Sequence, residues 1–211
     1  IIESSFIDLH SSADKVKIDS ILLQMNKFSS VDQLLTMQST SIINSYGGSG
    51  NLATIRLRGT GANNTSVYWN GFPINSVTTG STDLSLLPSS FFDKIEIVTG
   101  ASGSIYGSGT FGGAMNLISE VKFEKNTSIT FSAEKGSFKL SNFSANTIIS
   151  NKRIHYVLNA EYKYALNNFK FINRFKENSP SEVRKHNLSE NYGFIQNINI
   201  KLNESSQIET G

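Results

Sequence analysis

Cysteine is absent from the 211-residue sequence, and long apolar runs are absent as well. Without cysteine the chain can form no disulfide framework, no thiolate metal site and no cysteine nucleophile. Without a run of about 18 apolar residues it has no transmembrane helix. Neither absence excludes membrane-spanning strands, because strands that alternate apolar and polar residues produce no peak of hydropathy.

The sequence also lacks a large excess of charge of one sign, since 19 Lys and Arg residues against 17 Asp and Glu residues give a formal net charge of +2. No run of basic residues is present to follow a phosphate backbone, so we expect no nucleic-acid partner. The histidines His10, His155 and His186 lie far apart and lack the spacing of metal ligands. We find no Ser–His–Asp set and no paired carboxylates, and therefore expect neither an enzyme nor a bound cofactor or metal.

The common polar residues are serine, asparagine and threonine, and together with 16 glycines they favour turns and strands over helices. Their pattern changes near residue 120. Residues 1–120 mix short apolar runs with glycine-rich turns, whereas residues 121–211 form a series of alternating strands. We therefore expect a small α+β domain over 1–120 and antiparallel strands over 121–211.

Within the first part, the spacing of apolar residues predicts a short helix over Ser30–Leu35 and a second over Asp83–Leu87, which Pro88 ends. Asn70-Gly71 predicts a tight hairpin turn, because both residues tolerate positive φ. Strands are expected at Ala53–Arg58, Ser66–Trp69, Lys94–Val98 and Ala114–Ile118.

Within the second part, Ile154–Tyr164 and Tyr192–Leu202 alternate apolar and polar residues with a period of two. The connections around residues 135–137, 150–152 and 203–205 are short, whereas residues 167–189 form a long polar connection. Bacterial barrels combine short periplasmic turns with longer outer loops. A soluble antiparallel β-sandwich would produce the same alternation, so the pattern alone leaves both interpretations open.

Three segments of the first part carry a resemblance to a known family. They are residues 47–59 (GGSGNLATIRLRG), 67–75 (VYWNGFPIN) and 95–118 (IEIVTGASGSIYGSGTFGGAMNLI). In this order and spacing they resemble the plug domain of TonB-dependent outer-membrane receptors, most closely the vitamin B12 (cobalamin) receptor type. The chain departs from the family pattern at Asn70, where aspartate is usual, and at Thr99-Gly100-Ala101, where Arg-Gly-Pro is usual.

The resemblance implies an α+β plug domain over 1–120 and the first strands of a transmembrane β-barrel, cut short, over 121–211. It implies TonB-dependent uptake of a large scarce nutrient across the bacterial outer membrane, with a cobalamin-like corrinoid favoured. The alternatives are a ferric-siderophore receptor, a haem receptor (with His186 as a conceivable iron ligand) and a signalling or capture receptor without transport. The expected partners are TonB, outer-membrane lipid and the nutrient, with a surface lipoprotein as a further candidate.

The resemblance also assigns residues to roles. Ile1, Ile2 and Glu3 would be the remnant of a TonB box, an extended segment that pairs with TonB as an added strand. Arg56 and Arg58 would lock the plug to barrel carboxylates. The expected substrate-binding residues are Tyr46, Asn51, Leu52, Ala53, Thr54, Asn75, Val77, Thr78, Thr79 and Ser81.

These substrate-binding positions are polar or apolar but uncharged, which suits a large neutral ligand better than a highly anionic one. Residues 107–112 (GSGTFG) also match the dinucleotide fingerprint. That fingerprint must open a helix, and a strand is expected next, so we do not expect nucleotide binding.

Overall fold

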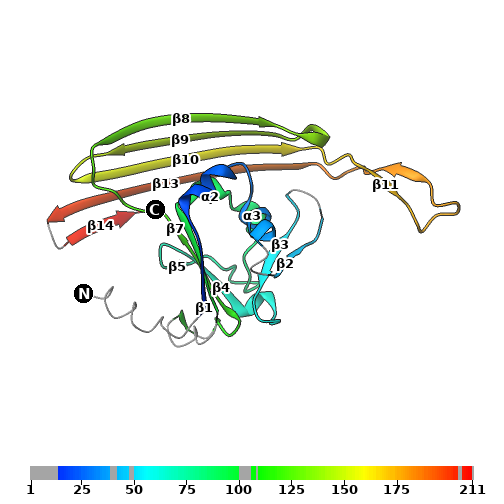
Figure 1. Cartoon of the computed structure of the whole chain (residues 1–211), viewed down its shortest axis with the longest axis horizontal. Coiled ribbons are helices and arrows are strands. Elements are labelled where there is room, and N and C mark those ends of the chain that lie inside the picture. The colour runs from blue at the N-terminus through cyan, green and yellow to red at the C-terminus, as the bar shows by residue number, and fades with distance from the viewer. Residues whose placement is uncertain are drawn as a thin grey trace. The chain divides into compact units, whose positions relative to one another are not determined.

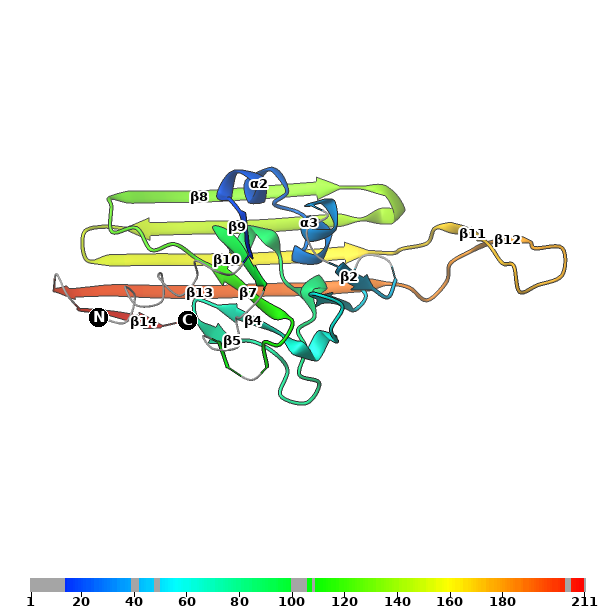
Figure 2. The same cartoon turned by 60° about the horizontal axis from the view of Figure 1, so that its bottom comes forward.

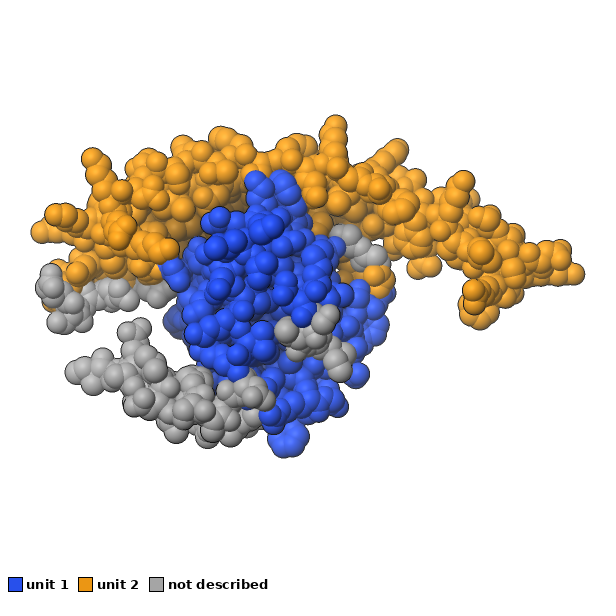
Figure 3. Space-filling model, viewed as in Figure 1, with its two compact units in different colours: residues 1–46, 52–120 blue, residues 47–51, 121–211 orange. Residues whose placement is uncertain are grey.

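The computed structural model of the chain describes residues 14–38, 42–47, 50–99, 106–107, 109–203 and 206–210. The chain divides into two compact units, residues 1–46 with 52–120 and residues 47–51 with 121–211 (Figure 3). The predicted TonB-box remnant at Ile1, Ile2 and Glu3 lies outside the described residues. Among the residues that are described, none belongs to a helix that is both long and apolar enough to cross a membrane.

The first unit is built on a five-stranded sheet in the order β1-β6-β7-β4-β5. Strands β4 and β7 are parallel and the other neighbours are antiparallel. The strands are β1 (Asp14–Ile18), β4 (Thr65–Trp69), β5 (Phe72–Pro73), β6 (Lys94–Thr99) and β7 (Gly113–Ile118). Helices α2 (Ser20–Met25) and α3 (Val31–Gln38), the hairpin β2 (Ile42–Ser45) and β3 (Ala53–Arg56), and the 3₁₀ turns η2 (Ala62–Asn64), η3 (Leu84–Leu86) and η4 (Ser89–Phe91) complete it.

One face of this sheet forms the core. Ile95 and Ile97 of β6 and Met115 of β7 are almost completely buried, because alternate residues of a strand share a face. Helix α3 buries an apolar stripe of Val31, Leu34 and Leu35. Glycine permits close packing at the start of β7, where a Cβ on Gly113 would lie 2.6 Å from the carbonyl oxygen of Val98.

The Asn70-Gly71 turn is confirmed, since φ is 45° at Asn70 and 86° at Gly71. Other boundaries differ from those expected. Strand β3 ends at Arg56 because the chain turns at Arg58, whose φ is 52°. Helix α3 begins at Val31 and continues to Gln38, and the second predicted helix is a single 3₁₀ turn over Leu84–Leu86.

The second unit is a five-stranded antiparallel sheet in the order β14-β13-β10-β9-β8, and Figure 1 shows its long strands side by side. Its strands are β8 (Asn126–Lys135), β9 (Ser141–Ser150), β10 (Ile154–Ala165), β13 (Ser189–Asn203) and β14 (Ser206–Thr210), with the 3₁₀ turn η5 (Ser137–Lys139) between β8 and β9.

The apolar face of this second sheet is exposed. Phe131 is 80% exposed, Tyr192 77% and Phe194 67%. A sandwich would bury this face in its core, so the β-sandwich interpretation is wrong. The opposite face is largely polar, and its residues Asn142, Asn159 and Asn197 are buried. Apolar side chains outside and polar side chains inside are the arrangement of a membrane barrel wall.

The long polar connection between β10 and β13 is more ordered than the sequence predicts. It contains a short hairpin of β11 (Lys170–Ile172) and β12 (Ser181–Val183). Figure 2 shows this hairpin beyond the ends of β10 and β13.

Candidate functional site

The predicted ligand loops of the plug are the β2–β3 connection and the segment 75–82. The first is closed by a hydrogen bond from the Tyr46 amide to the Leu52 carbonyl, 3.0 Å long. The second is followed by Asp83, whose Oδ1 accepts hydrogen bonds from the Ala53 amide at 3.0 Å and the Ser85 amide at 3.0 Å. Asp83 therefore ties the start of β3 to the end of the second loop.

The loop 75–82 is held in shape by its own polar groups. Asn75 Oδ1 accepts from the Val67 amide at 2.7 Å, and its Nδ2 donates to the carbonyls of Thr65 at 3.1 Å and Gly80 at 2.9 Å. The Gly80 amide donates to the Ser76 carbonyl at 2.8 Å. These bonds make the Asn75 side chain a brace of the loop.

Exposure divides the predicted ligand contacts into two groups. Val77 at the loop tip is fully exposed, its neighbours Thr78 and Thr79 are exposed, and Tyr46 and Leu52 are exposed on the other loop. Asn51 and Ser81 are partly exposed. By contrast, Ala53 is 0% exposed and Thr54 5% exposed, so their side chains pack inside the plug. The exposed group carries no charge.

The two arginines predicted to lock the plug differ in their surroundings. Arg56 is bound within the plug, because the Asn44 Oδ1 accepts from its Nε at 2.9 Å and its Nη1 at 3.2 Å in the amide orientation that satisfies both groups. Arg58 is exposed and forms no ion pair with any described residue. Its left-handed backbone is unusual for a residue with a side chain. Backbone strain of this kind concentrates at functional sites. Arg58 therefore remains the candidate for locking the plug to barrel carboxylates.

A polar row crosses the face of the plug sheet opposite the core. In register, Lys17 of β1, Glu96 of β6, Asn116 of β7 and Tyr68 of β4 follow one another. Tyr106 joins the row, since Asn116 Nδ2 donates to its hydroxyl at 2.8 Å and the Tyr68 hydroxyl donates to its carbonyl at 2.7 Å. Burial raises the pKa of Tyr106. Residues of the third sequence motif thus meet in space.

Glu96 is the ionic centre of this row, and its side chain is only 8% exposed. Its Oε2 lies 2.6 Å from Lys15 Nζ, and its Oε1 lies 2.6 Å from Lys94 Nζ. Burial raises the pKa of Glu96, but the hydrogen bonds and charges of the two lysines outweigh it and hold that pKa below its ordinary value. The Lys15–Glu96 pair joins β1, the strand that follows the N-terminal segment, to the centre of the sheet.

Sequence reasoning missed Asp83 as a loop brace and Lys15 as an ion-pair partner. The pattern Asp-x-Ser before an apolar run is a capping signal that could have identified Asp83. The short alternation of Lys15, Val16, Lys17 and Ile18 indicates a strand, but no local signal reveals that it pairs with β6.

The hairpin β11–β12 carries a pocket of about 640 Å³. Lys176, Arg184, Lys185 and His186 give it a basic lining, while Glu182 is paired with Lys176 at 2.7 Å. Within the described part of the chain, no group of three or more metal-ligand side chains comes together, so His186 lacks companion ligands there.

Comparison with known proteins relates the first unit to one family. The model of the TonB-dependent Receptor Plug Domain matches residues 8–114. A vitamin B12 transporter, BtuB, of Vibrio vulnificus (strain YJ016) is 36% identical over 116 residues, which are 55% of this chain and 18% of that protein. BtuB of Vibrio cholerae (strain M66-2) is 30% identical over 115 residues, 54% of this chain and 19% of the relative. The aligned region thus spans about a fifth of these relatives.

Solved structures extend the likeness to the second unit. The copper transporter OprC superposes with a TM-score of 0.71 at 12% identity, over 92% of this chain and 30% of that one. The siderophore receptor PirA from Acinetobacter baumannii gives 0.66 at 20% identity, over 92% and 30%. At these identities the likeness concerns the fold alone. The matched plug domain and the shared fold together identify the chain as a member of the TonB-dependent receptor family of the outer membrane.

Proposed function

We propose that this chain belongs to a receptor that takes up a large, uncharged nutrient of the corrinoid class across the outer membrane, energised by TonB. The observation that carries the proposal is the 36% identity of the plug region to a vitamin B12 transporter. The transport is physical, and the proposal includes no chemical step on the nutrient.

The exposed loop residues support a neutral ligand. Tyr46, Leu52 and Val77 offer apolar surface, and the hydroxyl groups of Thr78 and Thr79 offer hydrogen bonds. A ferric siderophore of high negative charge would gain more from arginines at these positions. We propose that these five residues contact the ligand, while Asn75 and Asp83 hold their loops in position.

The first sheet supports a route from TonB to the ligand loops. A segment captured by TonB through strand addition would pull on the chain before β1. Strand β1 is attached to β6 through its backbone ladder and through Lys15. Bound ligand would control access to the N-terminal segment, and TonB would then remove β1 from the sheet. The ligand site and the TonB site would thus be coupled through one displaceable strand, which is the requirement for allostery.

The proposal is tested by calorimetric titration of the full-length, detergent-solubilised receptor with cyanocobalamin. We expect saturable binding at nanomolar strength. A Val77→Asp and Thr79→Asp double variant should lose at least tenfold in affinity, whereas Met37→Asp, an exposed position on α3, should bind as the parent does. No heat and no competition with labelled cobalamin would remove the corrinoid assignment.

A second candidate function is uptake of an anionic ferric siderophore or haem. It is favoured by the basic pocket of the β11–β12 hairpin, where Lys176, Arg184, Lys185 and His186 gather. Titration with a ferric catecholate and with haemin separates the two candidates. Saturable binding that Arg184→Glu weakens would support the anionic ligand.

A further inference from the structure

The connection between β2 and β3 contains a glycine whose surroundings leave no room for a side chain. Residues 47–51 of this connection belong to the second compact unit, whereas Tyr46 and Leu52 on either side belong to the first. Within the connection, Gly50 has a φ of 81°, in the left-handed region that favours glycine. Backbone conformation is therefore one reason for glycine at this position.

The second reason is a close approach to the start of β13, in the same unit. A Cβ on Gly50 would lie 1.7 Å from Ser189 Oγ, 2.7 Å from Ser189 Cβ and 3.1 Å from Asn191 Nδ2. Real Cβ atoms do not approach other atoms within 3.0 Å, so the glycine backbone itself rests on these two side chains. We call this the Gly50 contact.

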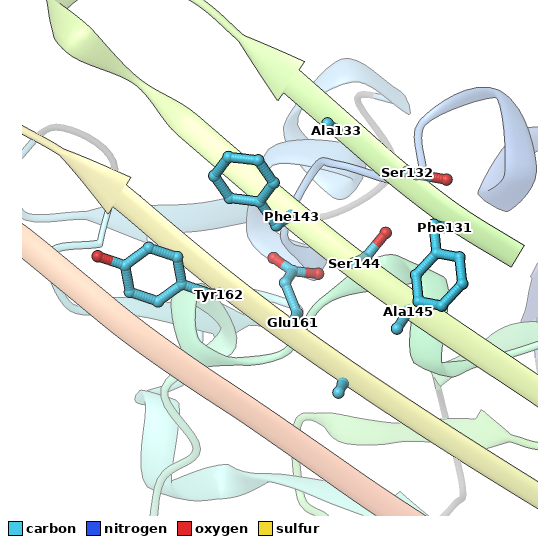
Figure 4. A pocket seen from close by; sticks show the side chains of 9 residues that line it. Phe131, Ser132, Ala133, Phe143, Ser144, Ala145, Glu161 and Tyr162 are labelled. Atoms are coloured by element: carbon cyan, nitrogen blue, oxygen red, sulfur yellow. The ribbon is translucent and has the colours of Figure 1, made fainter.

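The two β13 residues of the Gly50 contact lie on the polar face of the second sheet. Ser189 pairs with Ala165 and Asn191 with Lys163, and both partners are buried. The alternate positions carry the apolar face, where Figure 4 shows the ring of Tyr162 beside a shallow hollow. The Gly50 contact is thus on the side of the sheet away from this hollow.

Ser189 and Asn191 are held at the base of the long connection between β10 and β13. Asn191 Nδ2 donates a hydrogen bond to Ser189 Oγ at 3.2 Å. Two residues before Ser189, the carbonyl of Asn187 accepts from Asn167 Nδ2 at 3.1 Å, which closes the base of the connection. The Gly50 contact therefore rests on residues fixed by the strand ladder and by side-chain hydrogen bonds.

A candidate ligand residue is adjacent to the Gly50 contact. The side chain of Asn51 lies against Gly47, where a Cβ would be 2.7 Å from Asn51 Nδ2. The hydrogen bond between the Tyr46 amide and the Leu52 carbonyl closes the connection on its other side. A displacement of Gly50 would consequently displace Asn51, and with it the exposed side chains of Tyr46 and Leu52.

We propose that Ser189 and Asn191 are positioning residues for ligand binding, which hold the β2–β3 connection in place through Gly50. The inference rests on the proposed function, because it treats Tyr46, Asn51 and Leu52 as ligand contacts. A loop that is already ordered loses less conformational entropy when its ligand binds, so the Gly50 contact raises affinity without touching the ligand.

Two measurements on the full-length, detergent-solubilised receptor test the Gly50 contact. Calorimetry measures the affinity for cyanocobalamin, and hydrogen–deuterium exchange of residues 42–56 measures the order of the connection without ligand. Gly50→Ala should speed this exchange and weaken affinity by about tenfold, because the loop must then be ordered by the ligand. Cobalamin affinity and exchange of the same residues are compared in every variant.

Gly59→Ala is the matched control for backbone strain. Gly59 has a φ of 72°, and nothing lies within 4 Å of a Cβ built there. The substitution therefore introduces a similar left-handed alanine without a steric conflict. It should bind cobalamin as the parent does and leave the exchange of residues 42–56 unchanged.

A second substitution should rescue the first. Gly50→Ala combined with Ser189→Gly removes the two atoms nearest to the new methyl group and should recover most of the lost affinity and protection from exchange. Backbone strain at position 50 alone would not be relieved by a change in β13. Ser189→Val crowds the same contact from the other side, should reproduce both losses, and keeps the test decisive if Gly50→Ala fails to fold.

Equal exchange in the parent, Gly50→Ala and Ser189→Val proteins would overturn the proposal, as would a double variant no better than Gly50→Ala. The outcome for the nutrient is separate. If the parent binds no cobalamin but the exchange differences and their rescue appear, the corrinoid assignment fails and the positioning of the connection by Ser189 and Asn191 is supported.

Discussion

Replacing Glu96 by glutamine should release β1 from the plug sheet. The substitution keeps the size of the side chain but removes the charge that pairs with Lys15 and Lys94 at 2.6 Å. The two lysines then face each other without a counter-charge. Breaking a fully buried pair costs about 3–5 kcal/mol, and an exposed pair contributes about 0–1 kcal/mol. Because the carboxylate is buried and both lysines are 27% exposed, we expect about 2 kcal/mol for local opening of β1.

Hydrogen–deuterium exchange of the full-length receptor measures this opening directly. Two kcal/mol corresponds to exchange of the β1 amides roughly 30-fold faster, since 1.4 kcal/mol is a factor of ten. Lys15→Met should have a similar effect on β1. Lys17→Met is the matched control, because Lys17 lies across from Glu96 in the ladder but forms no ion pair with the described residues. Equal protection of β1 in the parent, Glu96→Gln and Lys15→Met proteins would refute the reasoning.

The same pair gives a pH dependence with a defined sign. The lysines hold the pKa of Glu96 below its ordinary value. The pair therefore stabilises β1 at pH above the unfolded pKa of about 4.3, and the stabilisation is lost as the pH falls through the lower folded pKa. Exchange of β1 relative to β7 should rise below that window in the parent and stay flat in Glu96→Gln.

Three further substitutions test the plug. Asn70→Ala removes the side-chain oxygen that accepts a hydrogen bond from the Ser119 amide, and it places alanine, which disfavours the left-handed region, at φ 45°. The free energy of unfolding, measured by denaturant titration, should therefore fall by about 1–2 kcal/mol. Asn70→Asp keeps an acceptor oxygen and should be tolerated. Asp83→Ala leaves the Ala53 amide without its acceptor, so exchange at the start of β3 should quicken and ligand affinity should fall, while Asp83→Asn should retain most of both. Arg58→Gly and Arg58→Ala both remove the guanidinium group, but only glycine relieves the strain of the left-handed backbone at this position. Equal loss of uptake with unequal thermal stability of the two variants would support the locking role. Full uptake by both variants would contradict it.

Local signals predicted those parts of the fold that depend on neighbouring residues. The Asn70-Gly71 turn follows from the conformational freedom of these two residues, and the long strands β10 and β13 follow from alternation sustained over many positions. The second predicted helix was reduced to a 3₁₀ turn because Pro88 follows closely.

What the sequence could not provide is pairing between distant segments. Strand β1 is only five residues long and α2 only six, so periodicity has little to act on. The salt bridge of Lys15 with Glu96 exists only because β1 pairs with β6. The burial of Ala53 and Thr54 likewise depends on the packing of the whole plug, which is why a motif-based assignment of ligand contacts included them.

The exposed apolar face of the second sheet bears on how such a chain reaches the outer membrane. Each strand spreads its apolar residues over alternate positions, so the mean hydropathy of the chain is only −0.20. An unfolded segment of this kind contains no long apolar stretch that would insert into the inner membrane as a helix during export. The lipid-seeking surface is created only when the strands pair and bring Phe131, Tyr192 and Phe194 onto one side. Secretion competence and membrane affinity are therefore properties of two different states of the same sequence.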